Sequence, residues 1–212
     1  MSRLRHSFPT SLGTIEAGID EDGVVLLKDL HFSAYDEKGQ AELLSTLNIL
    51  LNRGKEVVVV CVGTDRSAGD SLGPLVGTLI KELIPSSCIY GTLSDPVHAT
   101  NLAEKMNYIN SKHPGAFILA IDACLGNLDR VGHIVFKNQP LIPGAGVKKE
   151  LQPVGDACIT GIVNVGGFLE FFALQNTRLW TTYSLAKIIS GIVGQVLIRK
   201  ATIESIAIGQ SY

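Results

Sequence analysis

The chain has 212 residues, of which 46% are hydrophobic and 18% are charged. This length fits one domain, or one domain with an arm, and the composition excludes disordered, collagen-like and disulfide-stapled classes of protein. The 18 basic and 20 acidic residues give a net charge of -2, which disfavours nucleic acid and membrane surfaces as partners. The low charged fraction favours a buried sheet or a homo-oligomer.

The first 35 residues differ in pattern from the rest of the chain. The basic start, MSRLRHSFPTSLG, is followed by no apolar run, so we expect no signal peptide and a cytoplasmic protein. Two short apolar segments flank the turn-forming residues 20–23, which predicts an arm or a hairpin over residues 1–35. Residues 36–212 are expected to form a single α/β domain.

Helical and strand patterns alternate after residue 36. Apolar residues recur every three or four positions in four segments, which predicts helices over residues 36–52, 74–84, 100–111 and 181–200. Apolar runs predict strands over residues 57–62, 88–93, 116–122, 131–137 and 157–165. The proline- and glycine-rich connection after residue 137 is expected at the surface, and residues 167–175 are ambiguous. This order predicts a three-layer α/β sandwich with a mostly parallel sheet.

Two aspartates follow the most apolar strands. Asp70 lies in the loop after the strand 57–62, and Asp122 ends the strand 116–122. Because active sites of α/β sheets gather at the carboxyl ends of the strands, both carboxyl groups are expected to face one crevice. Close together, they would divide into one acid and one base, as peptide hydrolysis by water requires. Alternatively, Asp70 caps the following helix and Asp122 braces a turn.

Five other residues near these loops are candidates for substrate binding. They are Thr64, Asp65, Gly144, Gly146 and Asn164. The two glycines would let a lid move, or their loop is simply two linked turns. Asp65 is alternatively a surface residue and Asn164 a turn residue. No nucleotide-binding glycine pattern is present, and no histidine partner for a serine or cysteine nucleophile is visible, so we expect no cofactor and no such triad.

Metal binding is the weaker hypothesis for the same crevice. His98 follows the predicted strand 88–93, so His98, Asp70 and Asp122 could together hold a divalent ion. The four cysteines show no paired spacing for zinc or redox chemistry, and we interpret them as reduced core thiols: Cys61, Cys88, Cys124 and Cys158.

Four strings together suggest a family. VCVGTDRSAGDSLGPLVG, AIDACLG, PGAGVKKEL and ITGIVNVGG resemble the sporulation protease family YyaC, with similarity over residues 57–198. That family is similar to the germination protease of spore-forming bacteria and, more distantly, to the hydrogenase maturation proteases. The chain is shorter than a germination protease, and Lys148 and Lys149 replace the glycine and asparagine that follow PGAGV there.

The resemblance implies a phosphorylase/hydrolase-like fold and an atypical aspartic endopeptidase of the forespore or mother cell. Its substrates would be small acid-soluble spore proteins, and its catalytic aspartates would match Asp70 and Asp122. Two other functions stay open. One is a catalytically silent sporulation factor that binds a protein or peptide in the same cleft, and the other is a metal-dependent maturation protease.

Overall fold

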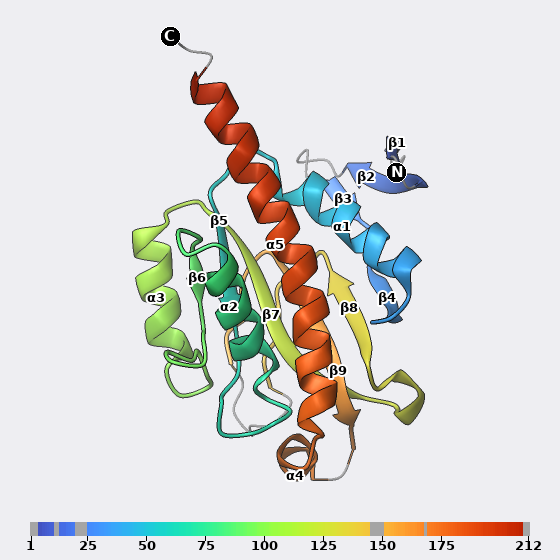
Figure 1. The fold of residues 1–212 in the computed structure, drawn as a ribbon, viewed down its shortest axis with the longest axis vertical. Coiled ribbons are helices and arrows are strands. Elements are labelled where there is room, and N and C mark those ends of the chain that lie inside the picture. The colour runs from blue at the N-terminus through green and yellow to red at the C-terminus, as the bar shows by residue number, and fades with distance from the viewer. Residues whose placement is uncertain (1–3, 11–12, 20–24, 145–150, 168, 210–212) are drawn as a thin grey trace.

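The computed structural model describes residues 4–10, 13–19, 25–144, 151–167 and 169–209. Within these ranges the strands form two sheets, which Figure 1 shows with their helices. A small antiparallel sheet consists of β1 (Leu4–Thr10), β2 (Gly13–Ile19) and β3 (Val25–Leu27). The main sheet consists of β4 (Leu30–Ser33), β5 (Val57–Cys61), β6 (Ile89–Tyr90), β7 (Phe117–Gly126), β8 (His133–Lys137) and β9 (Ala157–Val165).

The main sheet is mostly parallel. Its strand order is β4-β8-β9-β7-β5-β6, and β5 pairs in parallel with both β6 and β7, as β7 does with β9. Only β8 runs against its neighbours β9 and β4 among the strands described. The predicted fold class, an α/β sandwich with a mostly parallel sheet, is therefore confirmed. The sequence analysis assigned residues 1–35 to an arm or hairpin, whereas residues 30–33 form the edge strand of this sheet.

The central strands are apolar because both of their faces are covered. Every residue of β5 is buried, and β7 is buried from Phe117 to Ala123. Successive side chains of a strand point to opposite faces. In β7, Leu119 and Ile121 accordingly belong to one apolar cluster, while Ile118 and Ala120 belong to another.

Three helices cover the first face. They are α1 (Glu37–Leu51), α2 (Leu72–Leu83) and α5 (Leu179–Gly209). Helix α1 starts where predicted, because the Asp36 side chain accepts a hydrogen bond from the Lys38 backbone N–H at 3.1 Å. Helix α5 is longer than predicted and runs past the edge of the sheet in Figure 1.

Helix α5 is also long and apolar enough, by length and composition, to cross a membrane. The qualifying stretch is Leu179–Ile206, with 56% of its most apolar window buried in this structure. The buried residues include Leu185, Ile189 and Val193, which pack in the first apolar cluster. This is the arrangement of a core helix, as its periodicity predicts.

The second face is covered by α3 (Leu102–Lys112) and by part of the connection from β8 to β9. Leu141 and Val154 of that connection are buried and exchange two backbone hydrogen bonds, of 2.9 and 2.8 Å. The prediction that this connection lies at the surface is therefore wrong for its two ends. These two ends pack against the apolar side chains of β5 and β7 on the second face.

The chain reverses direction across the sheet at β5. It passes from β5 through α2 to β6 on one side, and then through α3 to β7 on the other side of β5. The carboxyl ends of β5 and β7 therefore border the point where strand order reverses, which is where ligands bind in open α/β sheets. Two short elements complete this end of the molecule, η1 (Leu128–Arg130) and α4 (Glu170–Gln175).

Candidate active site

A cavity of about 380 Å³ lies at the carboxyl ends of β5 and β7. Asp70, Asp122 and His98 all line it, although 52 residues of sequence separate the two aspartates. Both aspartates therefore line one crevice, as their positions in the sequence predict. Around them, the lining combines backbone of the β5–α2 loop with apolar side chains from α4 and from the β8–β9 connection.

Asp70 is positioned by a tightly packed loop. The Thr64 backbone N–H donates to the Asp70 carbonyl at 3.1 Å, and the Gly69 N–H donates to the Leu174 carbonyl of α4 at 2.9 Å. Gly63 has φ +138°, and a Cβ there would overlap the Asp70 carbonyl oxygen. The N-cap of α2 is Ser71, without a side-chain capping hydrogen bond. Asp70 is therefore not the capping residue that the alternative reading proposed.

Asp122 lies inside a strand and not in a turn. Strand β7 continues to Gly126, past the predicted end, with an irregularity in its pairing between Cys124 and Leu125. The Asp122 side chain is only 8% exposed and accepts a hydrogen bond from the Ala123 backbone N–H at 2.8 Å. By strand alternation it shares the face of Ala120, which is the face that α3 covers. The Asp122 carboxyl group therefore lies at the end of the apolar cluster between the sheet and α3.

The two carboxyl groups have different electrostatic environments. Burial, together with the negative charge of Asp70, raises the pKa of Asp122 well above its usual range. Burial also raises the pKa of Asp70, but hydrogen bonding from the Thr64 backbone N–H and the charge of His98 oppose that rise. Asp122 therefore retains its proton more strongly than Asp70 does.

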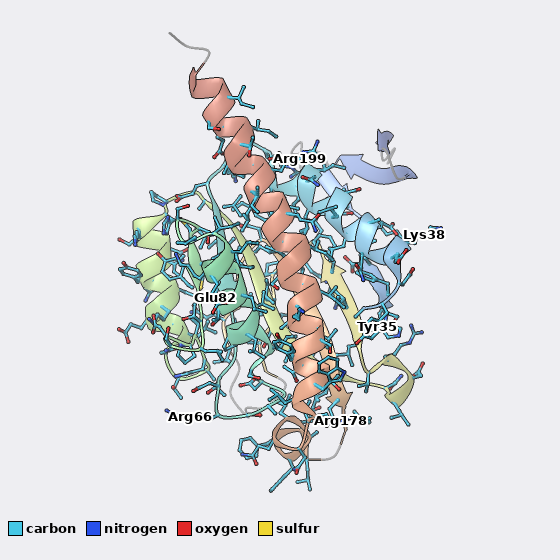
Figure 2. All side chains as sticks on the ribbon, in the orientation of Figure 1. Tyr35, Lys38, Arg66, Glu82, Arg178 and Arg199 are labelled. Carbon is cyan, nitrogen blue, oxygen red and sulfur yellow. The ribbon has the colours of Figure 1, made fainter. Side chains whose placement is uncertain are left out.

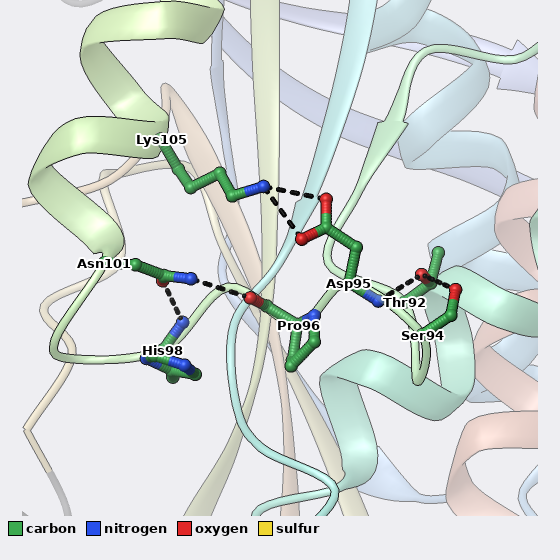
Figure 3. A network of polar contacts seen from close by, with 7 residues as sticks. All are labelled: Thr92, Ser94, Asp95, Pro96, His98, Asn101 and Lys105. Atoms are coloured by element: carbon green, nitrogen blue, oxygen red, sulfur yellow. Dashed lines mark hydrogen bonds and ion pairs between the residues drawn. The ribbon is translucent and has the colours of Figure 1, made fainter.

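His98 is held by a network of side chains at the start of α3, shown in Figure 3. Its backbone N–H donates to Asn101 Oδ1 at 2.8 Å, and Asn101 Nδ2 donates to the Pro96 carbonyl at 3.0 Å. Nearby, Lys105 binds both carboxylate oxygens of Asp95, at 2.7 and 2.9 Å. The His98 ring hydrogen-bonds Thr100 Oγ1 through Nδ1, 2.9 Å away. These contacts orient the imidazole at the cavity wall.

Helix α4 supplies a wall that the sequence analysis missed. Phe171, Leu174 and Gln175 line the cavity, and they lie in the segment whose periodicity was ambiguous. A helix of six residues is too short to show a helical period. The signal in the sequence was the aromatic pair Phe171 and Phe172, both of which remain more than half exposed.

The predicted substrate-binding residues divide into three groups. Thr64 and Gly144 line the cavity, and Gly146 falls outside the described residues. Asp65 is exposed and is not part of the lining. Asn164 is also absent from it, because its amide group joins β9 to α4: Nδ2 donates to the Ala173 carbonyl at 2.9 Å and to Thr177 Oγ1 at 3.2 Å. Asn164 thus supports the wall of the cavity from behind.

Two further polar residues of the β5–α2 loop reach the cavity. Ser67 lines it, and the Ser67 hydroxyl is buried without a hydrogen-bond partner among the residues described. Arg66 is exposed at the mouth, at the same end of the molecule as Arg178 in Figure 2. The loop therefore offers a substrate a neutral hydroxyl and a cation beside the carboxyl pair.

The geometry does not favour the alternative in which Asp70, Asp122 and His98 bind one divalent ion. In the described part of the chain, the ligand atoms of Asp70, Asp122 and His98 do not form a group within 4.8 Å of one another. Sharing one ion requires ligand atoms about 2.0–2.2 Å from it, so these side chains would have to move together first.

Comparison with known proteins identifies relatives of the chain. It is 54% identical over 138 residues to the Uncharacterized protein YyaC of Bacillus subtilis (strain 168), covering 65% of this chain and 67% of that protein. A solved structure, the NiFe hydrogenase maturation protease HycI of Thermococcus kodakarensis KOD1, matches with a TM-score of 0.40 and 16% identity, covering 69% of this chain and 97% of HycI. The predicted resemblance to YyaC is confirmed.

A family model covers most of the chain. It matches residues 31–192, from β4 into α5, and so includes both aspartates and every described wall of the cavity. The chain therefore belongs to the family described as Protein of unknown function (DUF1256).

Proposed function

We propose that the chain is a peptide hydrolase in which Asp70 and Asp122 act as base and acid. The observation that carries this proposal is the pair of carboxyl groups on one cavity whose environments separate their proton affinities. Such a separation lets one carboxyl group accept a proton while the other donates one at the same pH. Each group then has a defined role in acid–base catalysis.

The roles follow from burial and charge. Asp70, with the lower proton affinity, is the carboxylate that takes a proton from water as the oxygen attacks the peptide carbonyl. Asp122 is the carboxylic acid that gives its proton to the leaving nitrogen, and the proton held by Asp70 then restores it. His98 beside Asp70 favours the ionised form of the base.

The substrate class is a protein or peptide. The cavity walls include Phe171, Leu174 and Leu151, which suit an apolar side chain, while Ser67 offers a hydroxyl for hydrogen bonding. Because the chain resembles sporulation proteases, small acid-soluble spore proteins are the first substrates to test. We place the protein in the cytoplasm of the forespore or mother cell. This assignment needs no cofactor.

The test is cleavage of small acid-soluble spore proteins by the full-length chain, followed by mass spectrometry of the products. We expect Asp70→Asn and Asp122→Asn each to lower kcat by at least about 100-fold, the range of general acid–base catalysis. The matched control is Asp129→Asn, which changes an exposed carboxylate that pairs with the neighbouring Arg130. Unchanged turnover in a folded Asp122→Asn variant would remove Asp122 from the mechanism.

A second candidate function is peptide binding without cleavage. One observation favours it: α4 and the start of α5 expose a group of large apolar side chains, Leu169, Phe171, Phe172, Leu179 and Trp180. Exposed apolar groups of this kind mark binding surfaces. If wild type and both aspartate variants bind the same peptides with equal affinity and none cleaves them, the binding function replaces the hydrolase.

A further inference from the structure

A cluster of three potential metal ligands lies at the end of the sheet opposite the cavity. Glu56 immediately precedes β5, Cys88 immediately precedes β6, and His113 follows α3 as its C-cap. One ligand atom from each, a carboxylate oxygen, Sγ and a ring nitrogen, lie within 4.8 Å of one another. Since β5 has five residues and each adds about 3.3 Å, this cluster is on the order of 15–20 Å from the aspartates.

The backbone holds all three residues in place. The Phe117 N–H donates to the Glu56 carbonyl and the Val59 N–H to the Cys88 carbonyl, at 2.8 and 2.9 Å. The His113 N–H donates to the Ile109 carbonyl in the last turn of α3, at 2.8 Å. The three side chains therefore meet because β5, β6, β7 and α3 are fixed relative to one another, and a ligand that binds them meets a formed site.

The side chains already share polar contacts around one carboxylate oxygen. Glu56 Oε1 lies 2.8 Å from His113 Nδ1 and 3.4 Å from Cys88 Sγ. His113 is 8% exposed and Glu56 is 49% exposed, so the cluster has a buried side and an open side. On the buried side, Tyr90 Oη lies 2.8 Å from His113 Nε2. A metal-bound imidazole usually donates its second N–H to an oxygen acceptor, and the Tyr90 oxygen is placed to accept it.

We propose that Glu56, Cys88 and His113 bind a zinc ion. Cys88 Sγ, His113 Nδ1 and one Glu56 oxygen would supply three ligands, and the open side of the cluster leaves room for water as the fourth. A thiolate and an imidazole select zinc over magnesium and calcium, which prefer oxygen ligands.

Binding changes the protonation of the cluster in a balanced way. The Cys88 thiol releases its proton to solvent and becomes the thiolate, while Glu56 binds as the carboxylate. His113 binds through Nδ1 as the neutral imidazole, so the proton that Nδ1 donates to Glu56 before binding moves to Nε2, which then donates it to Tyr90 Oη. No redox step is involved. The net result is one proton released for each zinc ion bound.

Zinc bound here would join the starts of β5 and β6 to the end of α3, and α3 begins at the network that holds His98 at the cavity. Zinc that binds only the folded chain stabilises it by mass action. Because the cluster is far from the aspartates, this proposal stands or falls independently of the proposed hydrolase function.

The experiment uses the full-length chain, treated with a chelator and then titrated with Co²⁺ and Zn²⁺. We expect Co²⁺ to produce the near-ultraviolet absorption of a cobalt thiolate, Zn²⁺ to displace it, and Zn²⁺ at 100-fold its Kd to stabilise the chain by about 2.7 kcal/mol. Cys88→Ser should abolish the absorption. Glu56→Gln, at an exposed position, should weaken Zn²⁺ affinity at least tenfold without unfolding the protein.

The matched control is Cys124→Ser, which removes a partly buried cysteine outside the cluster and should leave the cobalt spectrum unchanged. Absence of the cobalt thiolate absorption in wild type overturns the proposal. So does a spectrum that survives in Cys88→Ser or disappears in Cys124→Ser. If Cys88→Ser fails to fold, unchanged Zn²⁺ affinity in Glu56→Gln is the contradicting result.

Discussion

The backbone carbonyl of Asp70 packs directly against Cα of Gly63, so closely that no Cβ fits between them. Gly63 lies at the β5 end of the loop and Asp70 at its α2 end. Thr64, the neighbour of Gly63, donates a backbone hydrogen bond to the Asp70 carbonyl and so links the two ends. The loop is therefore closed by backbone contacts. The position of the Asp70 carboxyl group depends on a residue that has no side chain.

Gly63→Ala should accordingly destabilise the chain by more than backbone strain alone. A residue with a Cβ at φ +138° is strained by about 1–3 kcal/mol, and the clash with Asp70 adds to this cost. The control is Gly54→Ala, since Gly54 also has positive φ but open space around it. Urea unfolding of both variants measures the difference, and equal losses of unfolding free energy would show that the Asp70 contact contributes nothing.

Asp122→Asn should stabilise the chain at neutral pH. Because the pKa of Asp122 is raised on folding, the native chain binds a proton that the unfolded chain has released. The stability associated with this group is complete below the unfolded pKa of about 3.9 and is lost as pH rises through the folded pKa. Asparagine does not titrate, so it removes that loss.

Thermal unfolding of wild type and Asp122→Asn between pH 3 and pH 8 tests this prediction. We expect the Tm advantage of the variant to grow as pH rises and to be smallest at pH 3. Asp129→Asn, an exposed carboxylate variant, should show no such trend. A Tm difference independent of pH would contradict the raised pKa.

The pH dependence of kcat/KM should be bell-shaped if the proposed roles are correct. Rate falls at low pH as Asp70 gains a proton and falls at high pH as Asp122 loses one. Both pKa values are raised, so the acidic limb lies above about pH 4. His98→Asn should move that limb to higher pH, because His98 favours ionised Asp70.

The control variant for His98→Asn is His31→Asn. His31 lies in β4, and its ring packs edge-on against the ring of His133 in β8, with 5.1 Å between the ring centroids. Its profile should match that of wild type. An acidic limb that does not move in His98→Asn would exclude His98 from control of the base.

Phe171→Ala should raise KM while leaving kcat nearly unchanged. Phe171 lines the cavity, and loss of its partly exposed ring removes about 1 kcal/mol of apolar contact, or roughly fivefold in KM. Phe172 is the matched control, because it is similarly exposed on the same helix but is not part of the lining. Steady-state kinetics should show a higher KM for Phe171→Ala than for Phe172→Ala. Equal values of KM would show that the substrate does not contact Phe171.

The sequence predicted the centre of the fold well because burial there leaves a clear pattern. Every residue of Val57–Cys61 is apolar, and so is each residue of β7 from Phe117 to Ile121. The edge of the sheet was less predictable. Strand β4 has four residues, and the direction of β8 depends on pairing with β9, which no local pattern records.

The candidate site was predicted in part for the same reason. The placement of Asp70 and Asp122 on one crevice follows from their positions near the carboxyl ends of parallel strands. The continuation of β7 beyond Asp122 to Gly126 was not predicted. The wall formed by α4 was missed because six residues show no period. Asn164 was a candidate for the crevice because it is polar at the end of an apolar run, and its hydrogen bond to α4 is a tertiary contact that no local pattern records.

The long helix α5 has a consequence for synthesis of the protein. In chain order the main sheet, as described above, is complete at Val165, but the part of its first face between α1 and α2 stays uncovered until Leu185, Ile189 and Val193 have left the ribosome. A nascent chain at that stage has every strand and an exposed apolar surface between α1 and α2, which is the kind of surface that aggregates or recruits chaperones. The first face of the sheet is therefore covered late in synthesis, when α5 emerges. The α4 wall of the cavity emerges only shortly before α5.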